Sequence, residues 1–275
     1  MTVPRSARLG PYDRGATPFF ACQADQRFSY CLYVPSGYDP DAGTDRPVLV
    51  TVHGSHRVAE SYRNAYRAFS ERTGCIVLAP LFPVGVGRPD DASGYKFLFL
   101  DGLRFDRVLL AMVEEVREKY GVRPADFLLA GFSGGGQFAH RFLYCHPARL
   151  RAVSIGAPGV VTLLDEGLPW WVGVGGLAEA MGCAPDLDAM RKVRVQMVIG
   201  GADTGTDEII LAPGHRYWMP GINDAGGNRV ERLEALRAGY ERAGIPVTFD
   251  RVPGIGHSGF ELISPVERFF EKALA

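Results

Sequence analysis

The sequence has no long hydrophobic run and no excess of charge. Its longest apolar stretches have the length of one strand, whereas a membrane-spanning helix needs about 20 apolar residues. The 30 Lys and Arg are balanced by 31 Asp and Glu, and the basic residues are scattered. A nucleic-acid surface or a membrane-binding patch needs clustered positive charge. The sequence therefore predicts no nucleic-acid partner and no membrane partner.

Cysteines are also few, and their spacing does not match the common metal and redox motifs. The five are widely spaced and include no CxxC pair: Cys22, Cys31, Cys75, Cys145 and Cys183. The first fifteen residues contain no apolar segment of the kind that a secretory signal peptide needs. From these two observations we expect reduced, mostly buried thiols in a cytoplasmic protein.

The sequence does have many apolar residues, and they alternate between strand-like and helix-like patterns. Hydrophobic residues make up 47% of the 275 positions, which is enough for one domain with a sizeable core. Short apolar runs predict strands at residues 28–34, 48–52, 75–80, 127–130, 152–157, 193–200 and 246–252. Helical spacing predicts helices at 58–72, 103–120, after 133, at 229–243 and at 265–274. This alternation is typical of the α/β class, with a doubly wound, mostly parallel sheet.

One segment breaks the alternation. Residues 158–192 are too long for an ordinary connection between strands. We expect them to form a small lid-like insertion in a single domain of residues 1–275. Trp170 and Trp171 lie in this segment. They either line a substrate pocket or pack the insertion onto the domain.

The strongest chemical signal is GFSGG at residues 131–135. A Gly-x-Ser-x-Gly pattern is weak evidence when it stands alone, but this one follows an apolar strand and begins an amphipathic helix. That context is the one a nucleophile elbow requires. The glycines permit a sharp turn that presents Ser133, and the helix N–H groups favour a developing oxyanion. The alternative is a glycine-rich turn in which Ser133 only caps the helix.

A serine hydroxyl needs a base before it can act as a nucleophile at neutral pH. His257 follows the last predicted strand, and the carboxyl ends of parallel strands meet at one edge of the sheet. We therefore expect His257 to be the base; a histidine bonded only to loop backbone is the alternative. The other histidines are assigned to turns or packing, or are left unplaced: His53, His56, His140, His146 and His215.

The base in turn needs a carboxylate that orients its ring. The stretch after the strand at 193–200 offers Asp203, Asp207 and Glu208. Asp203 comes first after the strand, so we expect it to lie nearest the edge of the sheet. The predicted catalytic residues are then Ser133, Asp203 and His257, in that order along the chain.

The tetrahedral intermediate of acyl transfer needs N–H donors for its oxyanion. One expected donor is the backbone N–H of Gly134, directly after the serine. The loop HGSH after the strand at 48–52 supplies the second, from Ser55 or, alternatively, His56. His53 and His56 also form an HxxH pair. Because no carboxylate or thiolate ligand lies nearby in sequence, we do not predict a metal site there.

In this order, VLVTVHGS, LLAGFSGGG, VIGGADT and VPGIGHS resemble the α/β-hydrolase superfamily of serine hydrolases. YCLYVPSGYDP followed by VLVTVHG is similar to the branch of feruloyl-esterase-like and polyhydroxybutyrate-depolymerase-like esterases. The resemblance implies a Ser–His–Asp triad, no metal or organic cofactor, and hydrolysis through an acyl-enzyme. We expect a small-molecule ester as the substrate. The chain departs from secreted members of that branch, because it shows no evident leader and no paired set of cysteines.

Three other functions fit the same residues. The first is an amidase or peptidase, because the leaving group is not readable from the triad. The second is an acyltransferase, in which an alcohol or amine replaces water. The third is a non-catalytic ligand-binding protein, since a fold does not fix a function. Association of the chain into a homo-oligomer is also left open.

Overall fold

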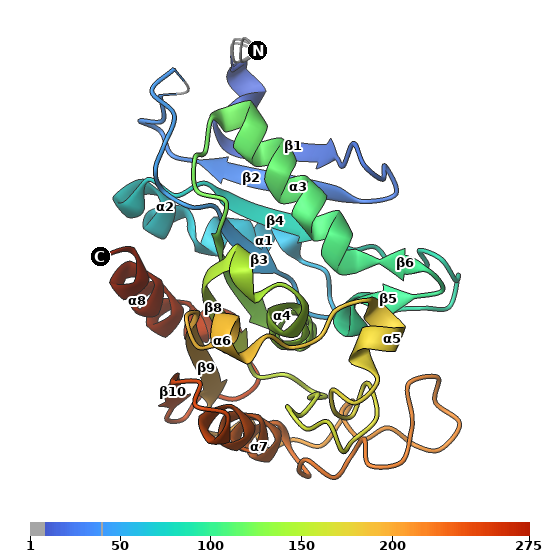
Figure 1. Cartoon of the computed structure of the whole chain (residues 1–275). Coiled ribbons are helices and arrows are strands. Elements are labelled where there is room, and N and C mark those ends of the chain that lie inside the picture. Colours follow the sequence, from blue (N-terminus) through green and yellow to red (C-terminus); the bar gives the residue numbers. More distant parts are fainter. Residues whose placement is uncertain (1–8, 40) are drawn as a thin grey trace.

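The chain folds around one eight-stranded sheet. In a computed structural model, which describes residues 9–39 and 41–275, the strand order is β1-β2-β4-β3-β7-β8-β9-β10 (Figure 1). The strands are β1 Gly15–Ala21, β2 Ser29–Val34, β3 Leu49–Val52, β4 Val77–Leu81, β7 Phe127–Phe132, β8 Leu150–Gly156, β9 Arg194–Gly200 and β10 Val247–Val252. β2 runs antiparallel to both its neighbours, and all pairings from β4 to β10 are parallel. The predicted mostly parallel sheet is confirmed.

Helices cover both faces of this sheet (Figure 1). The main helices are α1 Ala59–Ala65, α2 Arg67–Thr73, α3 Phe105–Tyr120, α4 Gly134–Cys145, α7 Arg229–Arg242 and α8 Ile263–Leu274. The apolar residues of α3, α4 and α7 pack into one large core on one face. Those of α2 and α8 pack into a second core on the other face. The sheet is therefore doubly wound, as the alternating sequence pattern predicts.

Local sequence explains where these elements lie and end. β3 reads Leu-Val-Thr-Val and is buried along its whole length, as expected of a strand between two helical layers. α3 buries its predicted apolar stripe and ends at Gly121, whose φ of 65° is left-handed. α7 begins after Asn228, whose side chain accepts a hydrogen bond from the Glu231 N–H.

Two element predictions are incomplete. The first strand is β1, not the segment at 28–34, and β1 lies at the edge of the sheet. Of its residues, Thr17 is the buried one, so the strand carries no apolar alternation that the sequence could reveal. The predicted helix at 58–72 is divided at Tyr66 into α1 and α2.

The insertion at 158–192 contains two short helices, α5 Leu177–Met181 and α6 Leu187–Met190. Beyond α5, Cys183 forms a disulfide with Cys145 at the end of α4, with their Cα atoms 5.2 Å apart. The expectation of five reduced cysteines is wrong for this pair, because the insertion folds back onto α4 and brings distant residues together. The other three cysteines are free and buried: Cys22, Cys31 and Cys75.

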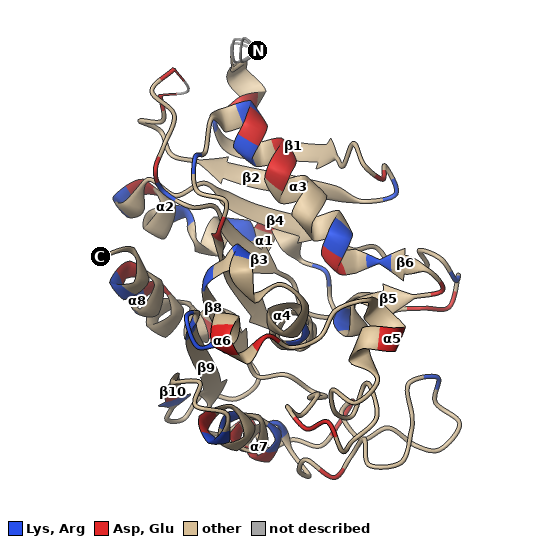
Figure 2. Ribbon diagram, viewed as in Figure 1, with Lys and Arg blue, Asp and Glu red and all other residues tan. Residues whose placement is uncertain are grey.

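Charged residues of both signs occur on α3, α7 and α8 (Figure 2). No helix in the described part of the chain is both long enough and apolar enough to cross a bilayer. The signal-peptide expectation concerns the start of the chain, and residues 1–8 lie outside the described residues.

Short elements form part of the connections. They include three 3-10 helices and one small hairpin: η1 Pro11–Asp13, η2 Gly94–Phe97, η3 Pro147–Arg149 and the pair β5 Phe99–Leu100 with β6 Leu103–Arg104. A further 3-10 helix, η4 Phe260–Leu262, leads into α8.

Candidate active site

Three polar side chains meet beyond the carboxyl ends of β7, β9 and β10. The Nε2 atom of His257 lies 3.0 Å from the Oγ of Ser133, and its Nδ1 lies 2.6 Å from the Oδ2 of Asp203. An ionised carboxylate only accepts hydrogen bonds, so Nδ1 carries the ring proton in the neutral histidine. Nε2 is then free to accept the hydrogen of the serine hydroxyl. The structure thus brings together the three residues that the sequence singles out.

The backbone at Ser133 is strained, with φ of 56° and ψ of −112°. A non-glycine residue in such a conformation costs about 1–3 kcal/mol and persists only where its surroundings hold it. The Ser133 N–H donates to the Gly156 carbonyl at 2.8 Å. A Cβ on Gly131 would overlap the Gly135 carbonyl, and a Cβ on Gly135 would overlap the Val52 carbonyl. Both glycines are therefore required for this turn.

Asp203 is almost completely buried, with 2% of its surface exposed. Its second oxygen, Oδ1, lies 3.5 Å from the guanidinium of Arg229 at the start of α7. Asp207, the alternative acid, is exposed, and its backbone carbonyl accepts a hydrogen bond from Arg229. The structure brings Asp203, and not Asp207, to the histidine.

The loop after β3 is held by a buried histidine. His53 Nε2 accepts a hydrogen bond from the Phe82 N–H at 3.1 Å, so Nδ1 carries the proton and donates to the Gly54 carbonyl at 2.8 Å. Burial lowers the pKa of His53 to about 4, so the ring is neutral. His53 therefore shapes the turn that carries Ser55. Both its nitrogens are engaged, so it has no lone pair left for a metal.

Two backbone N–H groups beside Ser133 are free. Among the described residues, neither the N–H of Gly134 nor that of Ser55 donates a hydrogen bond. Gly134 directly follows the serine, and Ser55 lines the same pocket as Ser133. His56, the alternative to Ser55, lines that pocket too.

The pocket beside Ser133 has a volume of about 230 Å³. Its walls are largely apolar and aromatic, with the Tyr62 and Phe260 rings stacked at 4.8 Å between centroids. The Glu208 carboxylate also lies at its wall. The full lining is Gly54, Ser55, His56, Val58, Tyr62, Phe132, Ser133, Glu208, His257, Ser258, Gly259 and Phe260.

No known family model and no curated protein matches this chain. Solved structures do match it. One is poly(aspartic acid) hydrolase-1 from Sphingomonas sp. KT-1, with 21% identity, 93% of this chain and 98% of that chain covered, and a TM-score of 0.73. Another is LpqC, a poly(3-hydroxybutyrate) depolymerase from Bordetella parapertussis, with 24% identity, coverage of 94% and 90%, and a TM-score of 0.73. A third is an S-formylglutathione hydrolase from Agrobacterium tumefaciens, with 16% identity, coverage of 90% and 89%, and a TM-score of 0.59.

The chain has the α/β-hydrolase fold. In the α/β-hydrolase fold the nucleophile sits on a sharp turn between a strand and a helix, and the acid and the histidine follow it along the chain. Ser133 lies between β7 and α4, and Asp203 and His257 come later in that order.

In this chain with the α/β-hydrolase fold, neither Trp170 nor Trp171 lines the pocket beside Ser133. Trp170 packs against the main core. Trp171 packs in a small separate cluster, and its Nε1 donates to the Tyr217 carbonyl at 2.9 Å. The substrate-contact expectation for the two tryptophans is therefore corrected in favour of packing. They fasten the insertion to the core and to the neighbouring loop of residues 204–228.

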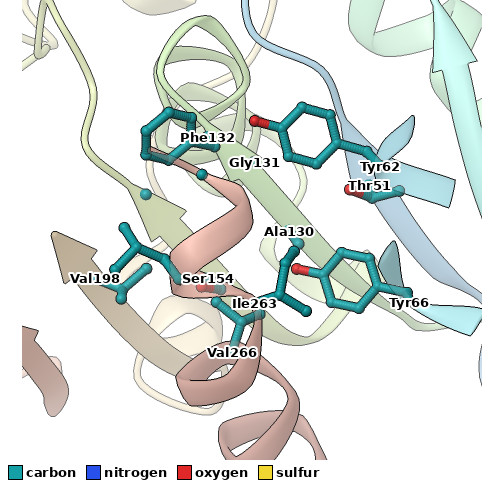
Figure 3. Close-up of a pocket in the computed structure, with 13 residues that line it drawn as sticks. Thr51, Tyr62, Tyr66, Ala130, Gly131, Phe132, Ser154, Val198, Ile263 and Val266 are labelled. Atoms are coloured by element: carbon teal, nitrogen blue, oxygen red, sulfur yellow. The ribbon is translucent and has the colours of Figure 1, made fainter. Parts of the chain in front are cut away.

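A second, much smaller cavity lies beneath the serine turn (Figure 3). It is enclosed by the end of β7, by Tyr62 and Tyr66 of the α1–α2 region, and by Ile263 and Val266 of α8. Its volume of about 20 Å³ matches a single water rather than a substrate. Tyr62, Phe132 and Gly259 border both cavities, so they lie between the pocket beside Ser133 and this interior cavity.

Sequence reasoning missed Tyr62 and Phe260 as pocket residues. Phe260 lies three positions after His257. The argument that places His257 at the edge of the sheet therefore also indicates a pocket position for Phe260. Tyr62 carries no local signal, because it is one aromatic residue within a predicted helix. Among the described residues, no group of three or more His, Cys, Asp or Glu is arranged to hold a metal ion.

Proposed function

We propose that the chain is a serine hydrolase that cleaves carboxylic esters, with a small-molecule ester as its substrate. The observation that carries the proposal is the hydrogen-bond chain from Asp203 through His257 to a serine in a strained turn. These hydrogen-bonded residues lie at a pocket whose walls are largely apolar and aromatic, as is usual for sites that bind small molecules. The names of the structural neighbours, which include a depolymerase and an S-formylglutathione hydrolase, support the same class of reaction.

In the first half-reaction, Ser133 Oγ attacks the ester carbonyl carbon while His257 Nε2 takes the hydroxyl proton. Asp203 keeps the proton of the neutral ring on Nδ1 and stabilises the imidazolium that forms. The N–H groups of Gly134 and Ser55 hold the oxyanion. The C–O bond to the alcohol then breaks, and His257 gives its proton to the leaving oxygen. Water attacks the acyl-enzyme by the same route and releases the acid and the serine.

Amide cleavage is the second candidate function. Poly(aspartic acid) is joined through amide bonds, and a hydrolase named for it is similar in fold over nearly the whole chain. The same triad serves both reactions, since contacts to the leaving group decide between them. Parallel assays on matched p-nitrophenyl esters and p-nitroanilides separate the two.

The test of the proposed function is covalent labelling with an active-site phosphonate. We expect one adduct on Ser133, located by peptide mass spectrometry, and p-nitrophenyl acetate turnover that falls at least about 10³-fold in Ser133→Ala. Ser258→Ala is the matched control, because Ser258 lines the same pocket without bonding to His257. In the Ser258→Ala variant the phosphonate adduct should still form on Ser133. Folded protein without an adduct and without turnover would leave ligand binding as the function to test.

A cytoplasmic location stays a prediction for this enzyme. The Cys145–Cys183 disulfide is evidence against a cytoplasmic location, because disulfides persist mainly in oxidising compartments.

A further inference from the structure

The short helix η2 packs directly against the start of α4. A Cβ on Gly134 would overlap the Tyr95 hydroxyl and would lie 3.1 Å from Cε of Lys96. Gly134 is the residue next to Ser133, and its N–H is one of the two proposed oxyanion donors. The Lys96 ammonium is one bond beyond Cε, so its positive charge lies close to the backbone of Gly134.

This ammonium has no carboxylate partner in the described part of the chain. Lys96 is half-buried, and its Nζ donates one hydrogen bond, to Ser93 Oγ at 3.2 Å. An ammonium has three N–H groups to donate. A partly desolvated cation without a counter-charge is costly, and a bound anion would offset that cost.

Two further cations beside η2 are also held without carboxylates. Arg57 donates to the backbone carbonyls of Ser55, Phe82 and Ala92, and its guanidinium lies over the Tyr95 ring. Arg141 is fully buried and donates to carbonyls, including that of Lys96, and to a threonine hydroxyl. The positive end of the α4 dipole adds to this field. Three cations without a carboxylate partner among the described residues therefore gather around η2 and the start of α4.

The acidic groups nearby, Asp91 and Glu208, do not form an ion pair with Lys96. Asp91 already accepts from the N–H groups of Ser93 and Gly94 and from the Tyr217 hydroxyl, and it lies 3.5 Å from Arg216. Glu208 is exposed, lines the pocket and forms no ion pair with Lys96, although its charge opposes the lowering of the Lys96 pKa. An anion bound between the serine turn and η2 would therefore meet a cation that no carboxylate of the described residues pairs with directly.

We propose that Lys96 binds a carboxylate of the substrate, so that the enzyme prefers esters that carry a negative charge close to the scissile carbonyl. This inference rests on the proposed esterase function. A charge-assisted hydrogen bond in a partly water-excluded site is strong enough to set such a preference. The cations around η2 would also raise the local concentration of anionic substrate. Lys96 is thus a specificity-determining residue.

The test compares two nearly isosteric esters, mono-p-nitrophenyl glutarate and its methyl ester, which differ in charge. We expect wild type to give a higher kcat/KM for the glutarate. In Lys96→Met the ratio of the two kcat/KM values should fall about ten-fold, and Lys96→Arg should retain most of it. Lys192→Met is the matched control, since Lys192 is an exposed lysine after α6, and it should leave the ratio unchanged.

The pH dependence of the same ratio is a second readout. Burial lowers the pKa of Lys96 to about 8; Arg57 and Arg141 act in the same direction, and Glu208 and Asp91 oppose them. The preference of wild type for the glutarate should therefore decline between pH 7 and pH 9.5, and Lys96→Arg should keep it.

An unchanged ratio in Lys96→Met, or a wild-type preference for the methyl ester, would overturn the inference. Failure of the proposed function looks different. It would appear as hydrolysis of neither ester and no phosphonate adduct on Ser133.

Discussion

At the scale of single residues, burial decides which of two similar side chains can orient the histidine. Asp203 and Asp207 are four positions apart and carry the same carboxyl group. Asp203 is buried between His257 and Arg229, whereas Asp207 faces solvent. A carboxylate held in this way keeps one tautomer and one ring orientation of the histidine, which an exposed loop carboxylate cannot do.

Asp203→Asn should lower kcat for a neutral p-nitrophenyl ester by about 10³–10⁴-fold, because an amide no longer fixes the proton on Nδ1. Asp207→Asn should change kcat by less than about two-fold. Circular dichroism establishes that both variants are folded, and steady-state kinetics gives the comparison. Equal losses in the two variants would mean that Asp203 does not orient His257.

At the scale of elements, the insertion at 158–192 is fastened to the domain rather than placed over the pocket. The disulfide ties it to the end of α4, and Trp171 ties it to the loop that contains Tyr217. His140 of α4 adds a third attachment, since its Nε2 accepts the N–H of Thr162 at 3.0 Å. The segment thus behaves as part of the scaffold behind the serine turn.

Reduction of the disulfide should destabilise the protein. The bridge closes a loop of 38 residues, and loop-entropy arguments assign about 4 kcal/mol to such a closure. Denaturant unfolding with and without reductant should show a loss of about 2–4 kcal/mol in the free energy of unfolding. In Cys183→Ser the reductant should have no further effect.

A thiol count checks the bond directly. The denatured protein should show three reactive thiols before reduction and five afterwards, because Cys22, Cys31 and Cys75 are free. Five thiols before reduction would rule out the bond in the isolated protein.

At the scale of the whole molecule, two buried histidines make stability depend on pH. His53 and His140 are both fully buried, and each bonds to backbone through both ring nitrogens. Burial lowers the pKa of His53 to about 4 and that of His140 well below its usual value. Both rings therefore stay neutral in the folded protein at a pH where they charge in the unfolded chain.

Stability should accordingly fall as the pH drops from 7 to 5. In this range the unfolded chain binds protons at both histidines with a pKa of about 6.5, and the folded state does not. The contribution is fully present above pH 7 and is lost progressively towards pH 4. His53 accounts for about 2 kcal/mol of the loss by pH 5, and His140 adds to it in the same direction.

Urea unfolding at pH 7, 6 and 5 measures this loss. His140→Gln should flatten the dependence, whereas His215→Gln, at an exposed site, should leave it as in wild type. Equal free energies of unfolding at pH 7 and pH 5 would contradict the argument.

Most of the architecture was predictable because its signals are local. β3 is a run rich in β-branched residues, and α3 carries a complete apolar stripe. In each case the local sequence predicts which side chains are buried. The meeting of Ser133, Asp203 and His257 was predictable for a related reason. Parallel strands bring their carboxyl ends to one edge, so residues that follow them lie close together there. β1 was not predictable, since an edge strand with little buried surface needs no apolar pattern.

Sequence alone thus supplied the α/β class, the order of most strands along the chain and the expectation that Ser133, Asp203 and His257 meet. Tertiary structure decided which surfaces face the pocket. Tyr62 and Phe260 line it and the two tryptophans do not, Cys145 pairs with Cys183, and Lys96 lies beside Gly134. Each of these facts is a contact between residues far apart in the chain. The local sequence pattern indicates whether a side chain is buried. Only the packed fold determines which other residues that side chain contacts.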